Sequence, residues 1–435
     1  MGLATDIEGV SYLFWTDSSN QRPGTFARAS ATSFHPVDSE PLLSVRPLAL
    51  PGSPRVAIVH DWLITPAGSE AVLREVLRLF PDGVLHCVID RMAPEARAQL
   101  GVARTTATWL SRLPGVSRYY RSLLPVMPMA IESLDLSAYD LVISSSHAVA
   151  KGVRPRVGAL HLCYCHSPMR YAWDLEATYL EEAGLAAGVR GVLVRALLQR
   201  LRRWDRDSAA RVSTFMANSA FVASRIERAY GRRSTVVHPP VDTTFFTPGA
   251  DAARGTQFVT ASRLVSYKRV HAIVEAFRNL PDQQLVVIGD GPDRERVLAA
   301  AGPNVTWLGR VSDDALRNAL QRARAFVFAA EEDFGILPVE AQACGTPVIA
   351  LGRGGARETV TLESGMFFED PSPASIAAAI RTFLEAPPPS SAVCRQNAER
   401  FAVGHFHTAF TDVVHSAWAA HQQVSPATAP RRATV

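Results

Sequence analysis

From residue 55 onward, short runs rich in β-branched residues alternate with longer stretches that have the apolar spacing of helices, and this alternation constrains the fold most. It is typical of parallel sheets covered by helices on both faces. The first half predicts strands at 56–59, 84–88, 141–144, 160–164, 214–217 and 235–237. The second half predicts strands at 258–261, 285–288, 305–308, 325–328, 348–350 and 366–368. The sequence therefore predicts an α/β protein with two consecutive Rossmann-like units.

The length of the chain agrees with two units. Its 435 residues, 47% of them hydrophobic, exceed the roughly 250–300 residues at which one core stops growing. We expect a first domain at 55–242, a second domain at 243–402, and a helix at 403–421 that crosses back to the first domain. Residues 1–54 carry six prolines and no sustained period, so we expect an extension outside the fold. Residues 422–435 are expected to form a disordered tail.

Charge and cysteine content exclude several classes of protein. The formal net charge of +4 arises from 45 basic and 41 acidic residues, which is too balanced for a dedicated nucleic-acid binder. Five cysteines in or near apolar runs predict buried thiols in a reducing compartment. No apolar run reaches the roughly 18 residues that span a bilayer, and no signal-peptide pattern is present. We therefore expect a cytoplasmic protein without a nucleic-acid partner.

The glycine-rich turns do not match the common nucleotide-binding fingerprints. The Gly-Asp-Gly run at 289–291 follows a predicted strand, but Arg294 stands where the dinucleotide fingerprint requires glycine. The glycines at 352–355 fail in the same way, because Arg357 occupies the third glycine position. The sequence also lacks a phosphate-binding loop ending in Gly-Lys-Ser or Gly-Lys-Thr. Nicotinamide, flavin and P-loop enzymes are therefore disfavoured.

The most informative segment, Glu-Asp-Phe-Gly-Ile-Leu-Pro-Val-Glu-Ala at 332–341, lies between a predicted strand and a predicted helix with Pro338 in its first turn. Each of the carboxylates Glu332 and Glu340 can accept hydrogen bonds from the vicinal diol of a ribose or a hexose. Gly335 lets backbone amides approach a ligand, and a helix N-terminus favours a diphosphate. The segment predicts a nucleotide-sugar site. Its binding residues are expected to be Phe334, Gly335, Ile336, Leu337 and Glu340.

This context resembles the Glu-x7-Glu motif of glycosyltransferase family 4, whose members have the GT-B fold, with two Rossmann-like domains facing a central cleft, and retain the anomeric configuration. Family members carry an arginine after the first strand of the second domain and a lysine a few residues later, and Arg263 and Lys268 match them. The resemblance implies that both cations, together with a helix N-terminus, stabilise the departing nucleoside diphosphate without a metal. Gly354 resembles the family's glycine-rich turn beside the donor, although a structural turn explains it equally well.

The first domain carries further motifs of this family. Gly68 stands where members usually have two glycines near the phosphates, and Ala67 replaces the other. The segments 124–136, 144–147 and 165–174 resemble the subgroup that includes bacterial O-antigen mannosyltransferases. His166 ends a strand and is expected to lie nearest the reacting centre, where it positions a sugar hydroxyl. The resemblance covers residues 55–420 and implies His166, Arg263, Lys268 and Glu332 as the catalytic set.

A metal-dependent alternative would require an Asp-x-Asp triplet just after a strand. The one such triplet, Asp205-Arg206-Asp207, lies in an arginine-rich helical stretch, where pairing with neighbouring arginines is the natural interpretation. We therefore expect no metal and no cofactor apart from the nucleotide-sugar substrate.

Seven arginines lie between residues 190 and 211 among apolar residues at helical spacing. A basic amphipathic surface of this kind can lie on anionic lipid, although a helix packed on its own domain with a solvated face explains the pattern equally well. Peripheral contact with the inner face of the cell membrane would suit a lipid-linked acceptor.

The sequence favours a retaining, metal-independent transfer of mannose from GDP-mannose. The expected acceptor is a polysaccharide or a polyprenyl-diphosphate-linked oligosaccharide. Three alternatives stay open: a UDP-sugar donor, a nucleotide-sugar epimerase on the same fold, and a nucleotide-sugar binding protein without turnover.

Overall fold

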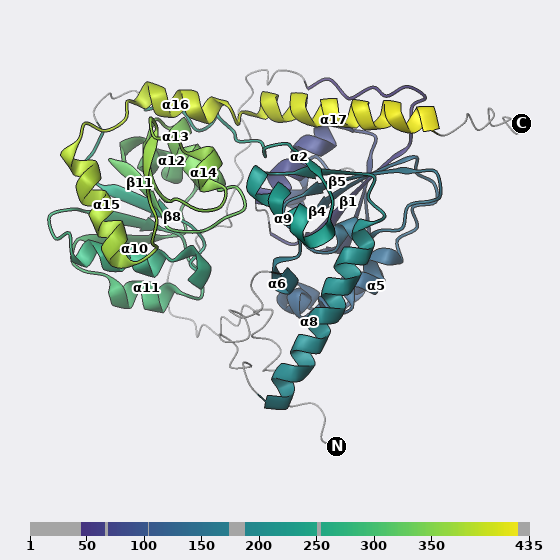
Figure 1. Ribbon diagram of the computed structural model, residues 1–435, viewed down its shortest axis with the longest axis horizontal. Coiled ribbons are helices and arrows are strands. Elements are labelled where there is room, and N and C mark those ends of the chain that lie inside the picture. Colours follow the sequence, from purple (N-terminus) through teal and green to yellow (C-terminus); the bar gives the residue numbers. More distant parts are fainter. Residues whose placement is uncertain (1–44, 66–67, 103, 174–187, 250–253, 425–435) are drawn as a thin grey trace, which may run out of the picture.

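The computed structural model describes residues 45–65, 68–102, 104–173, 188–249 and 254–424, which form two α/β domains, each with a parallel sheet (Figure 1). The first sheet has the order β3-β2-β1-β4-β5-β6-β7. Its strands are β1 (Val56–Leu63), β2 (Val84–Asp90), β3 (Thr105–Ala107), β4 (Leu141–Ser146), β5 (Leu160–Cys165), β6 (Thr214–Ala217) and β7 (Ser234–Val236). The second has the order β10-β9-β8-β11-β12-β13. Its strands are β8 (Phe258–Ala261), β9 (Leu285–Ile288), β10 (Val305–Gly309), β11 (Ala325–Phe328), β12 (Val348–Leu351) and β13 (Gly365–Phe368).

Every strand that the sequence predicts is confirmed, and the prediction of two Rossmann-like domains is correct. The central strands have apolar runs because helices cover both faces of a parallel sheet. The runs of β4 and β5 end in polar or reactive side chains that are nevertheless buried. Those ends belong to the carboxyl edge of the sheet, where α/β proteins place their ligand sites.

Helices cover both sheets. In the first domain they are α2 (Gly68–Leu79), α3 (Pro94–Gln99), α4 (Val116–Tyr119), α5 (Met127–Glu132), α6 (Arg170–Trp173), α8 (Gly188–Ala209) and α9 (Ala220–Tyr230), with 3-10 turns η1 (Trp109–Arg112), η2 (Tyr120–Leu123) and η3 (Ala150–Gly152). In the second domain they are η4 (Ser266–Lys268), α10 (Val270–Arg278), α11 (Arg294–Ala300), α12 (Asp313–Arg322), α13 (Ile336–Ala343), α14 (Ala356–Thr359), α15 (Pro373–Glu385) and α16 (Ser391–Glu399). All five cysteines are buried free thiols, as predicted.

The last helix, α17 (Val403–Val424), leaves the second domain and lies along the first (Figure 1). Phe406, Phe410, Val414 and Trp418 recur every four residues, so they form one stripe of the helix. This stripe is buried in the core that β1, β4, β5 and α2 build. Burial of each large side chain contributes roughly 1.5–3 kcal/mol, which fixes α17 to the first domain.

Residues 45–54 also lie against the first domain, whereas the sequence analysis left them out of the fold. Leu50 is buried in the same core as α17, and the Leu48 amide donates to the Leu79 carbonyl at 2.8 Å. The Trp418 indole donates to the Pro51 carbonyl at 3.0 Å. Prolines and the absence of a period hid this segment, because its order comes from contacts with a helix at the other end of the chain. Residues 1–44 and 425–435 lie outside the described residues, so the extension and the disordered tail expected there stay predictions.

We predict that Phe410→Ala lowers the urea midpoint of unfolding by the equivalent of roughly 3–5 kcal/mol, because it opens a cavity in the first-domain core. The control is Val424→Ala on the same helix, where the side chain is 83% exposed and the midpoint should not move. An unchanged midpoint for Phe410→Ala would mean that α17 is not docked on the first domain in solution.

Candidate active site

The loops that follow β5, β8 and β11 meet at the junction of the two domains. Arg170, at the start of α6, lies 3.6 Å from the Asp333 carboxylate of the second domain. Its guanidinium also lies over the Tyr267 ring, 5.4 Å from the ring centroid. The carboxyl edges of both sheets therefore contribute side chains to one region.

Lys268 and Glu332 form an ion pair in this region, with side chains only 16% and 17% exposed. Lys268 ends η4 and Glu332 follows β11, so the pair joins two loops of the second domain. Burial, together with the positive charge of Arg170, lowers the pKa of Lys268 to about 7. An anionic ligand would restore its full charge, because a nearby negative charge favours the protonated amine. Two residues that the sequence suggested separately thus act on one another.

Arg263 lies on the loop between β8 and η4, where its side chain is exposed. Close backbone packing fixes the path of this loop. A Cβ atom on Gly289 would lie 1.8 Å from the Ser262 carbonyl oxygen, and one on Gly291 would lie 2.2 Å from the Leu264 carbonyl oxygen. The Gly-Asp-Gly run that fails as a dinucleotide fingerprint therefore has a structural role beside Arg263.

The N-terminus of α13 points at the same junction. Gly335 caps it with φ of 86° and offers no side-chain cap, so the first-turn amides of Ile336 and Leu337 keep the donor capacity of a helix start. Such a terminus attracts an anion through its amides and its dipole. The Phe334 side chain, in contrast, packs in the second-domain core beside Phe401, which leaves only its backbone to face a ligand.

Glu340 lies on the second turn of α13 and is half-buried. Burial and the negative charges of Asp313 and Asp242 raise its pKa to about 8. A buried carboxyl with a strongly raised pKa is a feature of functional sites. It can accept hydrogen bonds from hydroxyl groups as the carboxylate or donate one as the acid.

The Gly354-Gly355 turn holds the loop that carries Glu332. Gly354 has φ of 61°, and a Cβ atom there would lie 2.5 Å from the Glu332 carbonyl oxygen. The Gly355 amide donates to that same oxygen at 2.8 Å. Of the two roles that the sequence left open for Gly354, the geometry accounts for the structural turn.

In the first domain, His166 follows β5 and is half-buried. Its Nε2 atom lies 2.8 Å from the Ser145 hydroxyl, and its backbone amide donates to the Ser146 carbonyl at 2.9 Å. Burial and the neighbouring rings of His147 and His60 keep the pKa of His166 well below its usual value. The imidazole is therefore neutral at neutral pH.

Gly68, the first residue of α2, lies close to Ile336 at the start of α13. A Cβ atom on Gly68 would lie 2.9 Å from Ile336 Cδ1. The predicted sites of the two domains therefore meet at the N-terminus of α13. Ala67 lies outside the described residues.

Asp61 is a structural residue that no motif in the sequence indicates. Its buried carboxylate accepts four hydrogen bonds, of 2.6–3.0 Å, from the amides of residues 147–150. It also pairs with His147 Nδ1 at 3.0 Å. Asp61 thereby fixes the loop after β4, and the neighbouring strands β1 and β4 bring the two segments together. The pairing of β1 with β4 in the folded sheet reveals this role of Asp61, which no sequence spacing indicates.

Two carboxylates of the second domain bind α9 in the first, one at its start and one at its second turn. Glu358 accepts hydrogen bonds from the amides of Ala220 and Phe221 at 2.8 and 2.9 Å. Asp333 pairs with Arg225. Burial raises the pKa of Glu358, but the hydrogen bonds from His238 and the two amides outweigh it and hold that pKa below the usual value. These contacts, which we call the α9 contact, join the domains beside the candidate site.

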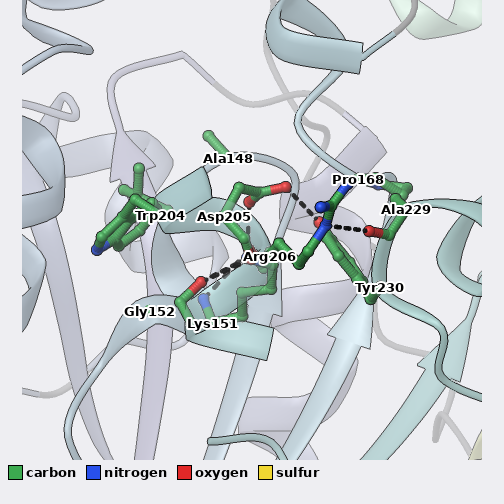
Figure 2. Close-up of polar contacts among 12 residues, drawn as sticks. Ala148, Lys151, Gly152, Pro168, Trp204, Asp205, Arg206, Ala229 and Tyr230 are labelled. Atoms are coloured by element: carbon green, nitrogen blue, oxygen red, sulfur yellow. Dashed lines mark hydrogen bonds and ion pairs between the residues drawn. The ribbon is translucent and has the colours of Figure 1, made fainter. Parts of the chain in front are cut away.

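The Asp-x-Asp triplet has a different environment from the one expected. Asp205 is buried and pairs with Lys151 Nζ at 2.6 Å, rather than with the neighbouring arginines (Figure 2). It also accepts hydrogen bonds from Trp173 and Tyr230 at 2.8 Å. The triplet therefore stabilises the packing of α8 on the first domain. Within the described ranges, no group of histidine, cysteine and acidic side chains is arranged to hold a metal ion, and no helix is long and apolar enough to cross a membrane.

Comparison with curated proteins identifies mannosyltransferases and inositol phosphate glycosyltransferases as relatives. Over 180 residues the chain is 33% identical to the GDP-mannose-dependent monoacylated alpha-(1-6)-phosphatidylinositol monomannoside mannosyltransferase of Corynebacterium glutamicum, covering 35% of this chain and 47% of that protein. Over 260 residues it is 33% identical to the D-inositol 3-phosphate glycosyltransferase of Geodermatophilus obscurus, covering 52% and 58%. The chain thus spans about half the length of the curated relatives it matches.

Solved structures share the fold at low sequence identity. Sucrose-phosphate synthase from Thermosynechococcus elongatus superposes with a TM-score of 0.63 and 19% identity, covering 84% of this chain and all of that one. Anabaena HepE in complex with UDP superposes with a TM-score of 0.62 and 17% identity, covering 83% of this chain and all of that one. Both comparisons support the predicted GT-B fold.

We predict that Glu340→Gln stabilises the fold more at pH 8.5 than at pH 5. The folded pKa of about 8 exceeds the ordinary value of 4.5, so the stability contributed by the protonated side chain is lost between about pH 4.5 and 8. Glutamine stays neutral and does not lose it. The measurement is the thermal midpoint of wild type and variant at both pH values.

The control for that experiment is Glu385→Gln, which replaces an exposed glutamate at the end of α15. Its effect on the midpoint should be the same at both pH values. A pH-independent difference for Glu340→Gln as well would show that Glu340 is ionised and solvated in the folded protein.

A match to the family model described as Glycosyl transferases group 1 covers residues 247–401, which contain Arg263, Lys268, Glu332 and Glu340. The second domain is therefore similar to glycosyl transferases group 1 and is set in a two-domain GT-B fold.

Proposed function

We propose that this protein is a retaining glycosyltransferase that transfers mannose from GDP-mannose onto a lipid-linked oligosaccharide or polysaccharide. The observation that carries the proposal is the meeting of the Lys268–Glu332 ion pair with the uncapped N-terminus of α13. A fixed cation and a helix start suit a diphosphate, while a carboxylate suits sugar hydroxyls. The same loops lie within the glycosyl transferases group 1 domain.

In the proposed reaction, the donor diphosphate binds the amides of Ile336 and Leu337, with Lys268 and Arg263 as counter-charges. Glu332 accepts hydrogen bonds from the sugar, and Glu340 accepts them from the ribose. As the bond between the anomeric carbon and the phosphate oxygen breaks, negative charge grows on the nucleoside diphosphate, and the cations stabilise it. The two side chains and the helix start supply this charge stabilisation without a metal.

Retention requires the acceptor hydroxyl to attack from the face that the phosphate leaves. In this front-side displacement, the acceptor oxygen bonds to the anomeric carbon, and the departing phosphate oxygen takes the hydroxyl proton. The protein then has to position both partners and exclude water, rather than supply a nucleophile. His166 follows β5 at the carboxyl edge of the first-domain sheet and is the proposed positioning group for a sugar hydroxyl.

The assignment of GDP-mannose rests on the curated relatives, because two of them, from Corynebacterium glutamicum and Mycobacterium tuberculosis, are GDP-mannose-dependent mannosyltransferases. A UDP-sugar is the alternative donor within the same chemistry, and a nucleotide-sugar epimerase is the alternative activity on the same fold. An epimerase would change the sugar nucleotide without an acceptor, so product analysis of donor alone separates the two.

Isothermal titration with GDP, UDP and ADP, in EDTA and again with magnesium, tests the proposal. We expect GDP to bind most tightly and equally well in both buffers. The variant Lys268→Ala should weaken GDP binding about tenfold or more, since a charge-assisted contact contributes roughly 1.5–3 kcal/mol. Tighter binding of UDP would replace the donor, a magnesium requirement would contradict the metal-independent mechanism, and binding of none of the three would overturn the function.

We further propose that the acceptor is reached at an anionic membrane surface through α8. The N-terminal part of this helix extends away from the domain (Figure 1). It exposes Val192 and Leu193 by 62% and 66%, among the arginines of the same helix. Apolar side chains that enter the acyl region and cations that attract anionic headgroups together bind peripheral helices to membranes.

Leu193→Asp is expected to reduce cosedimentation with phosphatidylglycerol vesicles several-fold, because it replaces an apolar contact with a negative charge. Neutral phosphatidylcholine vesicles are the control and should bind weakly in both cases. Equal sedimentation of wild type and variant with the anionic vesicles would contradict the role of α8.

A further inference from the structure

We propose that Glu70, His60 and Ser145 form a chain of polar contacts that holds His166 in its Nε2–H tautomer and leaves Nδ1 as a hydrogen-bond acceptor for a sugar hydroxyl. That the hydroxyl belongs to a sugar rests on the proposed function, whereas the tautomer of His166 does not. The chain runs through the carboxyl ends of adjacent strands, because His60 of β1 is paired with Ser145 of β4 and β4 is paired with β5.

Ser145 is the central link of this chain. Its hydroxyl oxygen lies 3.1 Å from His60 Nδ1 and 2.8 Å from His166 Nε2. Among the described residues, these two nitrogens are its hydrogen-bond partners. A serine hydroxyl has one proton to donate, so one imidazole must present a bare nitrogen and the other an N–H group. The tautomer of one histidine therefore determines the tautomer of the other.

Glu70 selects between the two arrangements. Its Oε1 lies 3.5 Å from His60 Nε2, an electrostatic contact longer than a hydrogen bond. Its Oε2 accepts a hydrogen bond from the Ser69 hydroxyl at 2.8 Å. Burial raises the pKa of Glu70, but the contact with His60 and the Ser69 hydrogen bond outweigh it, so the group is ionised at neutral pH. A buried carboxylate facing a bare nitrogen would leave two acceptors opposed, which is costly.

The proton of a neutral His60 therefore sits on Nε2, and its bare Nδ1 accepts the hydroxyl proton of Ser145. The Ser145 oxygen must then accept the Nε2–H of His166. This leaves Nδ1 of His166 without a proton. Among the described residues, the hydrogen bonds of His166 are made by Nε2 and by its backbone, so the lone pair of Nδ1 is available to a ligand hydroxyl.

The surrounding groups hold the two rings without entering the chain. The His147 ring lies 6.1 Å from that of His60 and 6.2 Å from that of His166, but its Nδ1 pairs with Asp61. The Tyr164 ring contacts His166 edge-on at 5.1 Å, while its hydroxyl donates to the Val237 carbonyl. These contacts fix ring orientation, and Ser145 fixes the tautomer. His60, Ser145 and Glu70 are thus positioning residues that act through His166.

The test is nitrogen NMR of the full chain labelled with ¹⁵N-histidine at pH 8, where imidazole side chains are generally neutral. The His166 signals are assigned by their loss in His166→Asn. We expect a single neutral Nε2–H tautomer for His166 in the wild type and a mixture of tautomers in Ser145→Ala. Ser145→Thr keeps a hydroxyl and should restore the single tautomer.

A wild-type His166 in the Nδ1–H form, or a tautomer unchanged in Ser145→Ala, would overturn the proposal. Neither reading depends on activity or on the stability of a variant enzyme. In a transfer assay, Ser145→Ala should lower kcat/KM about tenfold, the scale of one lost hydrogen bond, while nucleoside diphosphate affinity stays the same. A protein with the expected tautomer but no transfer from any donor would support the chain of polar contacts and contradict the proposed function.

Discussion

The α9 contact, in which Glu358 accepts hydrogen bonds from the first amides of a first-domain helix and Asp333 pairs with Arg225 of the same helix, is the interaction on which the rest of the site depends. The first amides of a helix have no partner within it, so the Glu358 carboxylate satisfies those of α9 and complements the helix dipole. Because Asp333 follows Glu332 in the chain, the residue that joins the domains also fixes its neighbour. Interdomain geometry and the proposed donor site are therefore one structural unit.

Glycines carry much of the remaining precision. At Gly289, Gly291 and Gly354 one backbone approaches another so closely that a Cβ atom would overlap a carbonyl oxygen. These contacts lock the loops of Arg263 and Glu332 to their neighbours. A search for nucleotide fingerprints sees the same glycines only as incomplete motifs. In this fold they place ligand-binding side chains by packing backbone on backbone.

The sequence predicted the sheets well because strands buried on both faces must be apolar runs, which are visible without tertiary information. It missed β3 (Thr105–Ala107), whose three residues lack an apolar signal, and residues 45–54, whose order depends on α17. Local motifs in the sequence predicted the candidate site residues, but they did not predict which residues those side chains contact. The role of Asp61 and the link from His60 to Ser145 follow from strand order, and Lys151 could not be matched to Asp205 from sequence spacing.

The docking of α17 has a consequence for how the chain reaches its folded state. The apolar stripe of α17 completes the core of the first domain, yet its residues are made only after the whole second domain. During synthesis, part of the first-domain core therefore stays uncovered until the second domain and then α17 have been made. Domains commonly fold in order as they emerge from the ribosome. In this chain the first domain is synthesised first but completes its core last, when α17 docks on it.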